Sequence, residues 1–180
     1  MQAVDQIVLN FFVNSRIEWL TFVMMVITYS GSYLIVSGVT FLSAISFYIH
    51  KHTSKIFPLF VSVIGSAATV FIIKHIFYRA RPFFEAFYPE TGSSFPSGHA
   101  TAAMALYGFL IYAIWRHDKH HLKNPFIIFL SILIILVGVS RLYLGVHYFS
   151  DVLAGYAVGF IWILISIWLA KKKEKLVQRI

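Results

Sequence analysis

Residues 93–106 read "SSFPSGHATAAMAL", a polar Pro-Ser-Gly-His tetrapeptide directly before an alanine-rich apolar run. Proline suits the first turn of a helix, and Ser94 or Ser97 can cap the free N–H groups of that turn. We therefore expect residues 95–99 to start a helix, with small alanines that let neighbouring helices pack closely. The N–H groups of a helix start attract anions and Gly98 allows close approach, so this stretch predicts an anion site beside a buried helix.

The composition of the chain indicates a membrane protein. Of 180 residues, 59% are hydrophobic and 12% are charged, and the mean hydropathy is +0.77. A soluble domain has roughly 45–50% apolar and 25% charged residues. The formal charge of +8 is better explained by basic cytoplasmic loops than by binding to nucleic acid. The absence of cysteine excludes disulfides and thiol chemistry.

Five apolar runs are long enough, or nearly so, to cross roughly 30 Å of hydrocarbon. They lie at about 33–49, 56–77, 98–115, 126–143 and 148–170. In residues 1–32, Asp5, Arg16 and Glu18 interrupt the apolar character, so we expect an interfacial or re-entrant N-terminal helix there. The sequence therefore predicts an all-α integral membrane bundle of about five transmembrane helices, a single domain over residues 1–180, without a removable signal peptide.

Basic residues cluster in three segments outside the apolar runs. Ten of the 15 Lys and Arg residues lie there: Lys51, Lys55, Arg116, Lys119, Lys123, Lys171, Lys172, Lys173, Lys175 and Arg179. If the runs alternate across the membrane, these segments share one side, which we expect to be cytoplasmic together with the C-terminus. Lys74, Arg79, Arg81 and Arg141 break the pattern on the outer side, and ionisable residues placed so are functional candidates.

Three polar clusters are expected to meet on the outer side. Lys74 and Arg81 are seven residues apart, so they share a face if the second run continues as a helix until Pro82 ends it. The tetrapeptide at residues 96–99 is the second cluster. Concentrating positive charges at a membrane boundary is costly unless an anion neutralises them, so the clusters together predict a binding site for an anion.

The third cluster is "SRLYLGVHYFSD", residues 140–151. Arg141 is expected to end the fourth run, Gly145 to turn the chain, and His147 to open the fifth run with Asp151 four residues further on. That spacing lets the carboxylate accept from one imidazole nitrogen and leaves the other nitrogen available.

These residue types suit chemistry on a phosphoryl group. Three cations and the N–H groups of a helix start can surround the non-bridging oxygens and stabilise the charge of the transition state. A histidine oriented by a carboxylate can attack phosphorus, while a second histidine protonates the leaving oxygen and later activates water. Two histidines in two roles require no metal ion.

At these residues the sequence resembles the type 2 phosphatidic acid phosphatase family of membrane lipid phosphatases, which is related in fold and anion pocket to vanadium haloperoxidases and glucose-6-phosphatase. The first family signature, Lys, six residues and Arg-Pro, matches "KHIFYRARP" at 74–82. The second, Pro-Ser-Gly-His, matches 96–99, and the third, Ser-Arg, five residues, His, three residues and Asp, matches 140–151. The resemblance covers residues 56–170, which it implies to be a catalytic core of this family.

The resemblance also implies a role for each residue. His147 would be the nucleophile that forms a phosphohistidine, Asp151 would orient it, and His99 would be the general acid for the leaving group. Phosphate binding would fall to Lys74, Arg81, Ser97, Gly98 and Arg141. Neither a metal ion nor a cofactor is implied.

The expected function is that of a lipid phosphate or diphosphate phosphatase in the cell membrane, with its site facing outward. The five runs resemble the shorter undecaprenyl pyrophosphate phosphatases of the bacitracin-resistance type, so undecaprenyl pyrophosphate is the first expectation for the substrate. Phosphatidylglycerol phosphate and phosphatidic acid are the alternatives. Membrane lipids are the expected partners, and neither nucleic acid nor an obligate protein partner is indicated.

Other classes stay open at this point. Ser97 could serve an intramembrane serine protease, His99, His147 and Asp151 could hold a metal ion, and the bundle could bind lipid without turnover. The histidines of segment 117–121 are a remote candidate for a weak metal site.

The outer loop carries charges beyond the signatures: Arg79, Glu85 and Glu90. Arg79 could reach the second phosphate of a diphosphate, but we expect it, like Pro96, to lie on the rim of the site, with the arginine exposed there.

Overall fold

The computed structural model describes residues 2–82, 90–117 and 123–177. Within these ranges the regular structure is helical and no strand occurs, which confirms the predicted all-α bundle. The elements are α1 (Gln2–Asn14), α2 (Glu18–Tyr29), α3 (Tyr33–Ile49), the 3₁₀ turn η1 (Thr53–Lys55), α4 (Ile56–Ile76), α5 (Gly98–Ala103), the π-helical turn η2 (Met104–Gly108), α6 (Phe109–His117), α7 (Lys123–Tyr143) and α8 (Phe149–Val177).

Four helical stretches are long and apolar enough to cross a membrane by themselves. They are Thr53–Ile76, Gly98–Arg116, Lys123–Tyr143 and Phe149–Lys172. Each agrees with one of the last four predicted runs to within three residues at either end. Large apolar side chains stay exposed on their outer faces, among them Phe71, Ile128 and Phe160, as expected of helices that face lipid.

The first predicted span is the second half of a bent pair of helices. α3 has 17 residues, and it is long enough for a span only together with α2, from which it is bent by 48°. The break has a local cause: the Ser30 hydroxyl donates to Ile27 O at 2.6 Å, and Ser32 caps α3. The N-terminal segment therefore contains two helices, α1 and α2, and α2 packs along α7. Together, α2 and α3 form one broken span or a re-entrant loop.

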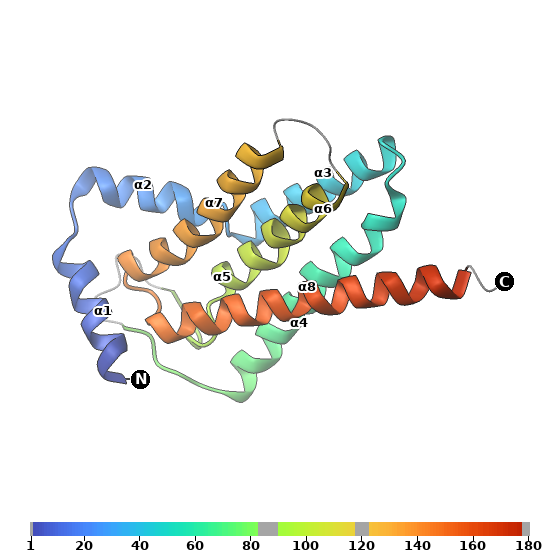
Figure 1. The fold of residues 1–180 in the computed structure, drawn as a ribbon. Coiled ribbons are helices and arrows are strands. Elements are labelled where there is room, and N and C mark those ends of the chain that lie inside the picture. The colour runs from blue at the N-terminus through green and yellow to red at the C-terminus, as the bar shows by residue number, and fades with distance from the viewer. Residues whose placement is uncertain (1, 83–89, 118–122, 178–180) are drawn as a thin grey trace.

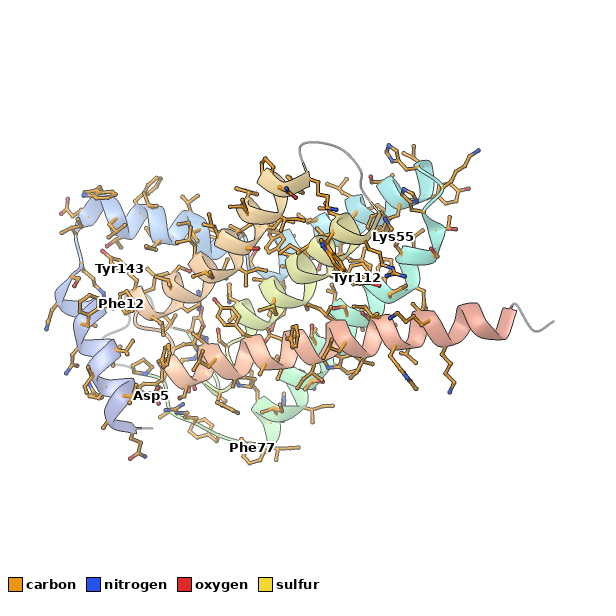
Figure 2. The ribbon with its side chains drawn as sticks, in the orientation of Figure 1. Asp5, Phe12, Lys55, Phe77, Tyr112 and Tyr143 are labelled. Atoms are coloured by element: carbon orange, nitrogen blue, oxygen red, sulfur yellow. The ribbon has the colours of Figure 1, made fainter. Side chains whose placement is uncertain are left out.

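α1 runs across one end of the bundle, transverse to the long helices (Figure 1). It is anchored there by α7, because the rings of Phe12 and Tyr143 lie 6.4 Å apart (Figure 2) and Arg16 Nε donates to Tyr143 O at 2.9 Å. Leu9 of α1 is buried. The location of α1 in the membrane interface stays a prediction.

The three basic segments come together at the other end of the bundle. Lys55 from the first segment, Arg116 from the second and Lys171 from the third line one cavity of about 130 Å³. The end of α8 that leads to the C-terminus lies there, far from α1 (Figure 1). The spans therefore alternate as the pattern of basic residues requires, and the assignment of that end to the cytoplasm stays a prediction.

Small residues let α8 approach the backbone of α5 and η2. A Cβ atom added at Gly155 would lie 2.6 Å from Ser97 O, and one added at Gly159 would lie 2.7 Å from Thr101 O. The alanines of α5 are buried against this contact. Close packing therefore holds the tetrapeptide of residues 96–99 against the helix that carries Asp151.

Candidate active site

A polar cavity of about 550 Å³ opens at the end of the bundle where α1 lies. It is lined by Tyr33, Lys74, His75, Tyr78, Arg81, Glu90, Thr91, Gly92, Ser93, Gly98, His99 and His147. Five of the eight residues predicted for catalysis or phosphate binding are in this lining. The three polar clusters, far apart in the sequence, therefore do meet at one place.

Lys74 and Arg81 face the cavity, but not through a continuous helix. α4 ends at Ile76, and Phe77 is extended (Figure 2), so the predicted two-turn spacing on one helix is wrong. The chain leaves the helix because residues 93–94 bind it: Ser94 N donates to Arg79 O at 2.9 Å. Both cations then donate to the same Ser93 carbonyl, and the distance from Arg81 Nη2 is 3.4 Å.

The tetrapeptide begins a helix at Gly98, where the third apolar run was expected to begin, and Ser97 is the cap. Ser97 accepts from Ala100 N, whereas Pro96 precedes the cap and follows a cis peptide bond. Ser97 is fully buried, and its N–H donates to the carbonyl of Asp151 at 3.0 Å. A hydroxyl held in this way suits a structural cap and not the nucleophile of a protease.

Gly98 lies where a side chain would collide with α3. A Cβ atom at this position would lie 2.7 Å from the hydroxyl of Tyr33. Glycine therefore lets the start of α5 and the tyrosine line the cavity together.

His147 lies just before α8, in the turn made by Gly145 at φ 69°. Its Nδ1 is 3.6 Å from Asp151 Oδ2, beyond hydrogen-bond distance, while Oδ2 accepts from Tyr148 N at 2.9 Å. Its Nε2 lies 3.3 Å from Arg81 Nη1. Because a guanidinium can only donate, Nε2 is the acceptor, and the proton of the neutral ring is on Nδ1, facing Asp151.

The charge state of His147 follows from its surroundings. Burial lowers the pKa of the His147 imidazole to about 4, with help from the charges of Arg141 and Arg81 and against the effect of Asp151. The ring is therefore neutral near pH 7, and Nε2 carries a lone pair that points to the cationic side of the site.

Arg141 is fully buried behind the cavity, and Thr28 and Glu90 are among its partners. Its Nη1 donates to Thr28 Oγ1 at 2.8 Å, and its Nη2 pairs with the Glu90 carboxylate. Glu90 also pairs with Arg81 Nη1 at 2.7 Å. Burial favours the neutral acid, but Arg141 and Arg81 outweigh it and lower the pKa of Glu90 to about 2. An ionised carboxylate thus lies between two arginines, where phosphate oxygens would also bind well.

Arg79 differs from its predicted place on the rim. It is not among the residues that line the polar cavity. Its Nη2 donates to Asp5 at 2.7 Å and its Nη1 to Asp151 at 2.6 Å, and its guanidinium lies over the Tyr148 ring at 4.4 Å. Two carboxylates hold Arg79 on the far side of Asp151, because together they offset the cost of its partial burial.

The site contains carboxylates that sequence analysis did not assign to it. Asp5 is distant from the signatures in the sequence and Glu90 lies in the loop between the first two of them. With Asp151 they balance much of the positive charge at this end of the bundle. The concentration of cations is therefore stabilised from within the protein, without an external anion. The available signal for Asp5 was that it is the single charged residue of its helix.

Two of the remaining sequence candidates, Glu85 and segment 118–122, lie outside the described residues. Within the described ranges no three His, Asp or Glu side chains are placed to hold a metal ion, so the alternative of a site formed by His99, His147 and Asp151 has no support from the geometry.

The fold and the site define a class of protein. The family model of the PAP2 superfamily matches residues 55–175, and the chain belongs to this superfamily as a membrane lipid phosphatase. This assignment replaces the alternatives of an intramembrane protease and a non-enzymatic bundle.

Particular relatives refine the assignment. The chain is 31% identical to phosphatidylglycerophosphatase B of Bacillus subtilis (strain 168), over 99% of this chain and 87% of that protein. It is 36% identical to the bacitracin transport permease protein BcrC of Bacillus licheniformis, over 46% of this chain and 36% of that protein.

Two crystal structures are similar in fold. A transmembrane PAP2-type phosphatidylglycerolphosphate phosphatase from Bacillus subtilis matches with a TM-score of 0.87 and 27% identity, over 95% of this chain and 86% of that one. LpxE of Aquifex aeolicus matches with a TM-score of 0.73 and 24% identity, over 88% of this chain and 92% of that one. The second likeness concerns the fold alone.

Proposed function

We propose that this phosphatase removes the terminal phosphate of phosphatidylglycerol phosphate in the outer leaflet. The observation that carries the proposal is the similarity, over nearly the whole chain, to phosphatidylglycerophosphatase B and to the structure of a phosphatidylglycerolphosphate phosphatase. Our first expectation, undecaprenyl pyrophosphate, depended on the five apolar runs. Those runs do not favour it, because the same runs match the phosphatidylglycerolphosphate phosphatase over 95% of the chain.

In the proposed reaction, Lys74, Arg81 and Arg141 hold the phosphate after it displaces Glu90, together with N–H groups at the start of α5. His147 Nε2 attacks phosphorus, and the P–O bond to glycerol breaks while His99 gives its proton to the leaving oxygen.

The second half of the reaction restores the enzyme. A water molecule gives a proton to His99 and attacks phosphorus, the P–N bond of the phosphohistidine breaks, and inorganic phosphate leaves. The position of Asp151 beside Nδ1 supports its role in stabilising the imidazolium that would form before the P–N bond is hydrolysed. No step requires a metal ion.

A phosphate-release panel tests the proposal. Purified protein is assayed with phosphatidylglycerol phosphate, phosphatidic acid, undecaprenyl pyrophosphate and diacylglycerol pyrophosphate, with and without EDTA. We expect phosphatidylglycerol phosphate to give the highest kcat/KM and EDTA to have no effect. Faster turnover of another lipid would overturn the substrate, and loss of activity in EDTA would overturn the metal-free mechanism.

Two variants accompany the panel. His147→Ala should abolish phosphate release because it removes the attacking nitrogen. His50→Ala is the matched control, since His50 lies near the opposite end and bonds to its own helix through Ser46 O at 2.8 Å.

The outward orientation has its own test, which the cysteine-free chain makes simple. Thr91→Cys places a thiol at the mouth of the polar cavity, and His52→Cys places one at the basic end. In intact cells a membrane-impermeant maleimide should label the first thiol and should reach the second only after permeabilisation. The reverse pattern would place the site on the cytoplasmic side.

A further inference from the structure

The N-terminal helix contributes a buried carboxylate to the surroundings of the active site. Asp5 is 3% exposed and lies between α1 and the first turn of α8 (Figure 2). Its Oδ1 accepts from Ser150 N at 2.8 Å, and its Oδ2 accepts from Ser150 Oγ and from Arg79 Nη2, both at 2.7 Å. One carboxylate thus caps α8 and holds a guanidinium.

Arg79 joins this carboxylate to a second one. Its Nη1 donates to Asp151 Oδ1 at 2.6 Å and to Ser150 Oγ at 2.7 Å. Its main chain is fixed as well, because Arg79 N donates to Ser93 Oγ at 3.2 Å. The guanidinium therefore has one position, with one carboxylate on either side.

The two oxygens of Asp151 have different neighbours. Oδ1 faces Arg79, and Oδ2 faces His147 Nδ1 and the N–H of Tyr148. A bond to Oδ1 fixes the rotation of the carboxylate and hence the direction of Oδ2. Asp5 also neutralises part of the positive charge of Arg79. Arg79 therefore weakens the attraction between the Asp151 carboxylate and a charged imidazole less than it would alone.

We propose that Asp5 is a positioning residue for the phosphatase reaction: it holds Arg79, and through Arg79 it sets the orientation and charge of the Asp151 carboxylate beside His147. This inference rests on the proposed roles of His147 and Asp151. It makes α1 a functional part of the site as well as a peripheral helix. The low exposure of Asp5 agrees with its role, since a buried carboxylate requires such partners.

The geometry separates this role from substrate binding. Neither Asp5 nor Arg79 is among the residues that line the polar cavity, whereas Lys74, Arg81 and His99 are. A change at Asp5 should therefore lower kcat and leave KM unaltered, because it weakens an interaction that matters most when the imidazole becomes charged.

Asp5→Asn is the test variant. Asparagine keeps an oxygen that can accept from Ser150 N and removes the charge that faces Arg79. With phosphatidylglycerol phosphate in detergent micelles, we expect kcat to fall roughly 10-fold, within the range of couplings between residues in contact. KM should stay within twofold, and Asp5→Glu should recover part of the lost kcat. Glu18→Gln, an exposed site at the start of α2, is the charge-matched control.

A double-mutant cycle shows whether Asp5 acts through Arg79. In an Arg79→Gln background, Asp5→Asn should change kcat by less than twofold, because the connection is already broken. Three outcomes would each overturn the inference. They are effects of the two substitutions on kcat that multiply in the double variant, a rise in KM with kcat unchanged, and a wild-type kcat in Asp5→Asn.

Ser150→Ala keeps the test usable if Asp5→Asn gives little folded protein. The serine hydroxyl lies between Asp5 and Arg79, so its loss should lower kcat by less than Asp5→Asn does and should leave KM unchanged. An unchanged kcat would overturn the inference. If wild-type protein turns over another lipid of the panel faster than phosphatidylglycerol phosphate, the proposed substrate is wrong, and the kcat comparison is made with that lipid. If it hydrolyses none, the proposed function and this inference both fall.

Discussion

Replacing Glu90 by glutamine should make inorganic phosphate a tighter inhibitor of this phosphatase. Glu90 pairs with Arg81 and Arg141, two of the residues proposed to bind phosphate. A phosphate ion must displace the carboxylate before it can take both arginines. Glutamine has nearly the same size but no charge, so the variant should leave the arginines available to phosphate.

The size of the effect follows from the pKa of Glu90. Burial favours the neutral acid, but Arg141 and Arg81 lower the pKa from 4.5 to about 2. At 1.36 kcal/mol per pKa unit, the site stabilises the ionised carboxylate by about 3 kcal/mol. The side chain is 22% exposed, so solvent screening leaves an effect on phosphate binding of about 1.4 to 3 kcal/mol, or roughly 10- to 100-fold.

The measurement is the inhibition constant of inorganic phosphate at pH 7, where Glu90 is ionised in the wild-type protein. Wild type, Glu90→Gln and the exposed control Glu18→Gln are compared in the same detergent. We expect the inhibition constant to fall 10- to 100-fold in Glu90→Gln and to stay constant in the control. An unchanged or higher constant in Glu90→Gln would refute the competition between carboxylate and phosphate.

Three further predictions concern pH, packing and phosphate binding. Ionised Glu90 stabilises the folded state fully above pH 4.5 and loses this contribution as the pH falls towards 2; Tm should therefore fall more steeply in wild type than in Glu90→Gln, and equal slopes would contradict this. Gly155→Ala brings a Cβ to 2.6 Å from Ser97 O and should cost about 1–3 kcal/mol of stability, while Gly38→Ala, with no atom within 4 Å, should not lower Tm. Arg81→Lys should lower kcat/KM about 10- to 100-fold, since an ammonium cannot replace the planar guanidinium at its several partners; activity within twofold of wild type would show that charge alone suffices.

Much of the fold could be predicted because apolar length is a strong signal. The last four spans follow from it directly, since hydrocarbon thickness sets how many apolar residues a helix needs. The bent pair could not be predicted in the same way. Asp5, Arg16 and Glu18 interrupt the apolar character of residues 1–32, and the packing of α2 against α7 shows that this helix belongs to the bundle.

The candidate site was predictable in its signature residues and not in their partners. Lys74, Arg81, His99 and His147 meet at one cavity as expected, although Lys74 and Arg81 reach it by a route that helix periodicity does not give. Their meeting depends on residues 93–94, which are distant in sequence: the Ser93 hydroxyl donates to Phe77 O and the main-chain N–H of Ser94 donates to Arg79 O. The counter-charges were missed for the same reason: nothing near Asp5 in the sequence indicates that Arg79 is its partner.

The position of Asp5 has a consequence for biogenesis. Its partners Arg79 and Ser150 follow it by 74 and 145 residues. During synthesis the N-terminal helix emerges first, yet it cannot reach its final place until the last span has been inserted. The docking of α1 is therefore a late step of assembly. A chain truncated before residue 150 would lack the Ser150 contacts that hold Asp5, and its active site would be incomplete.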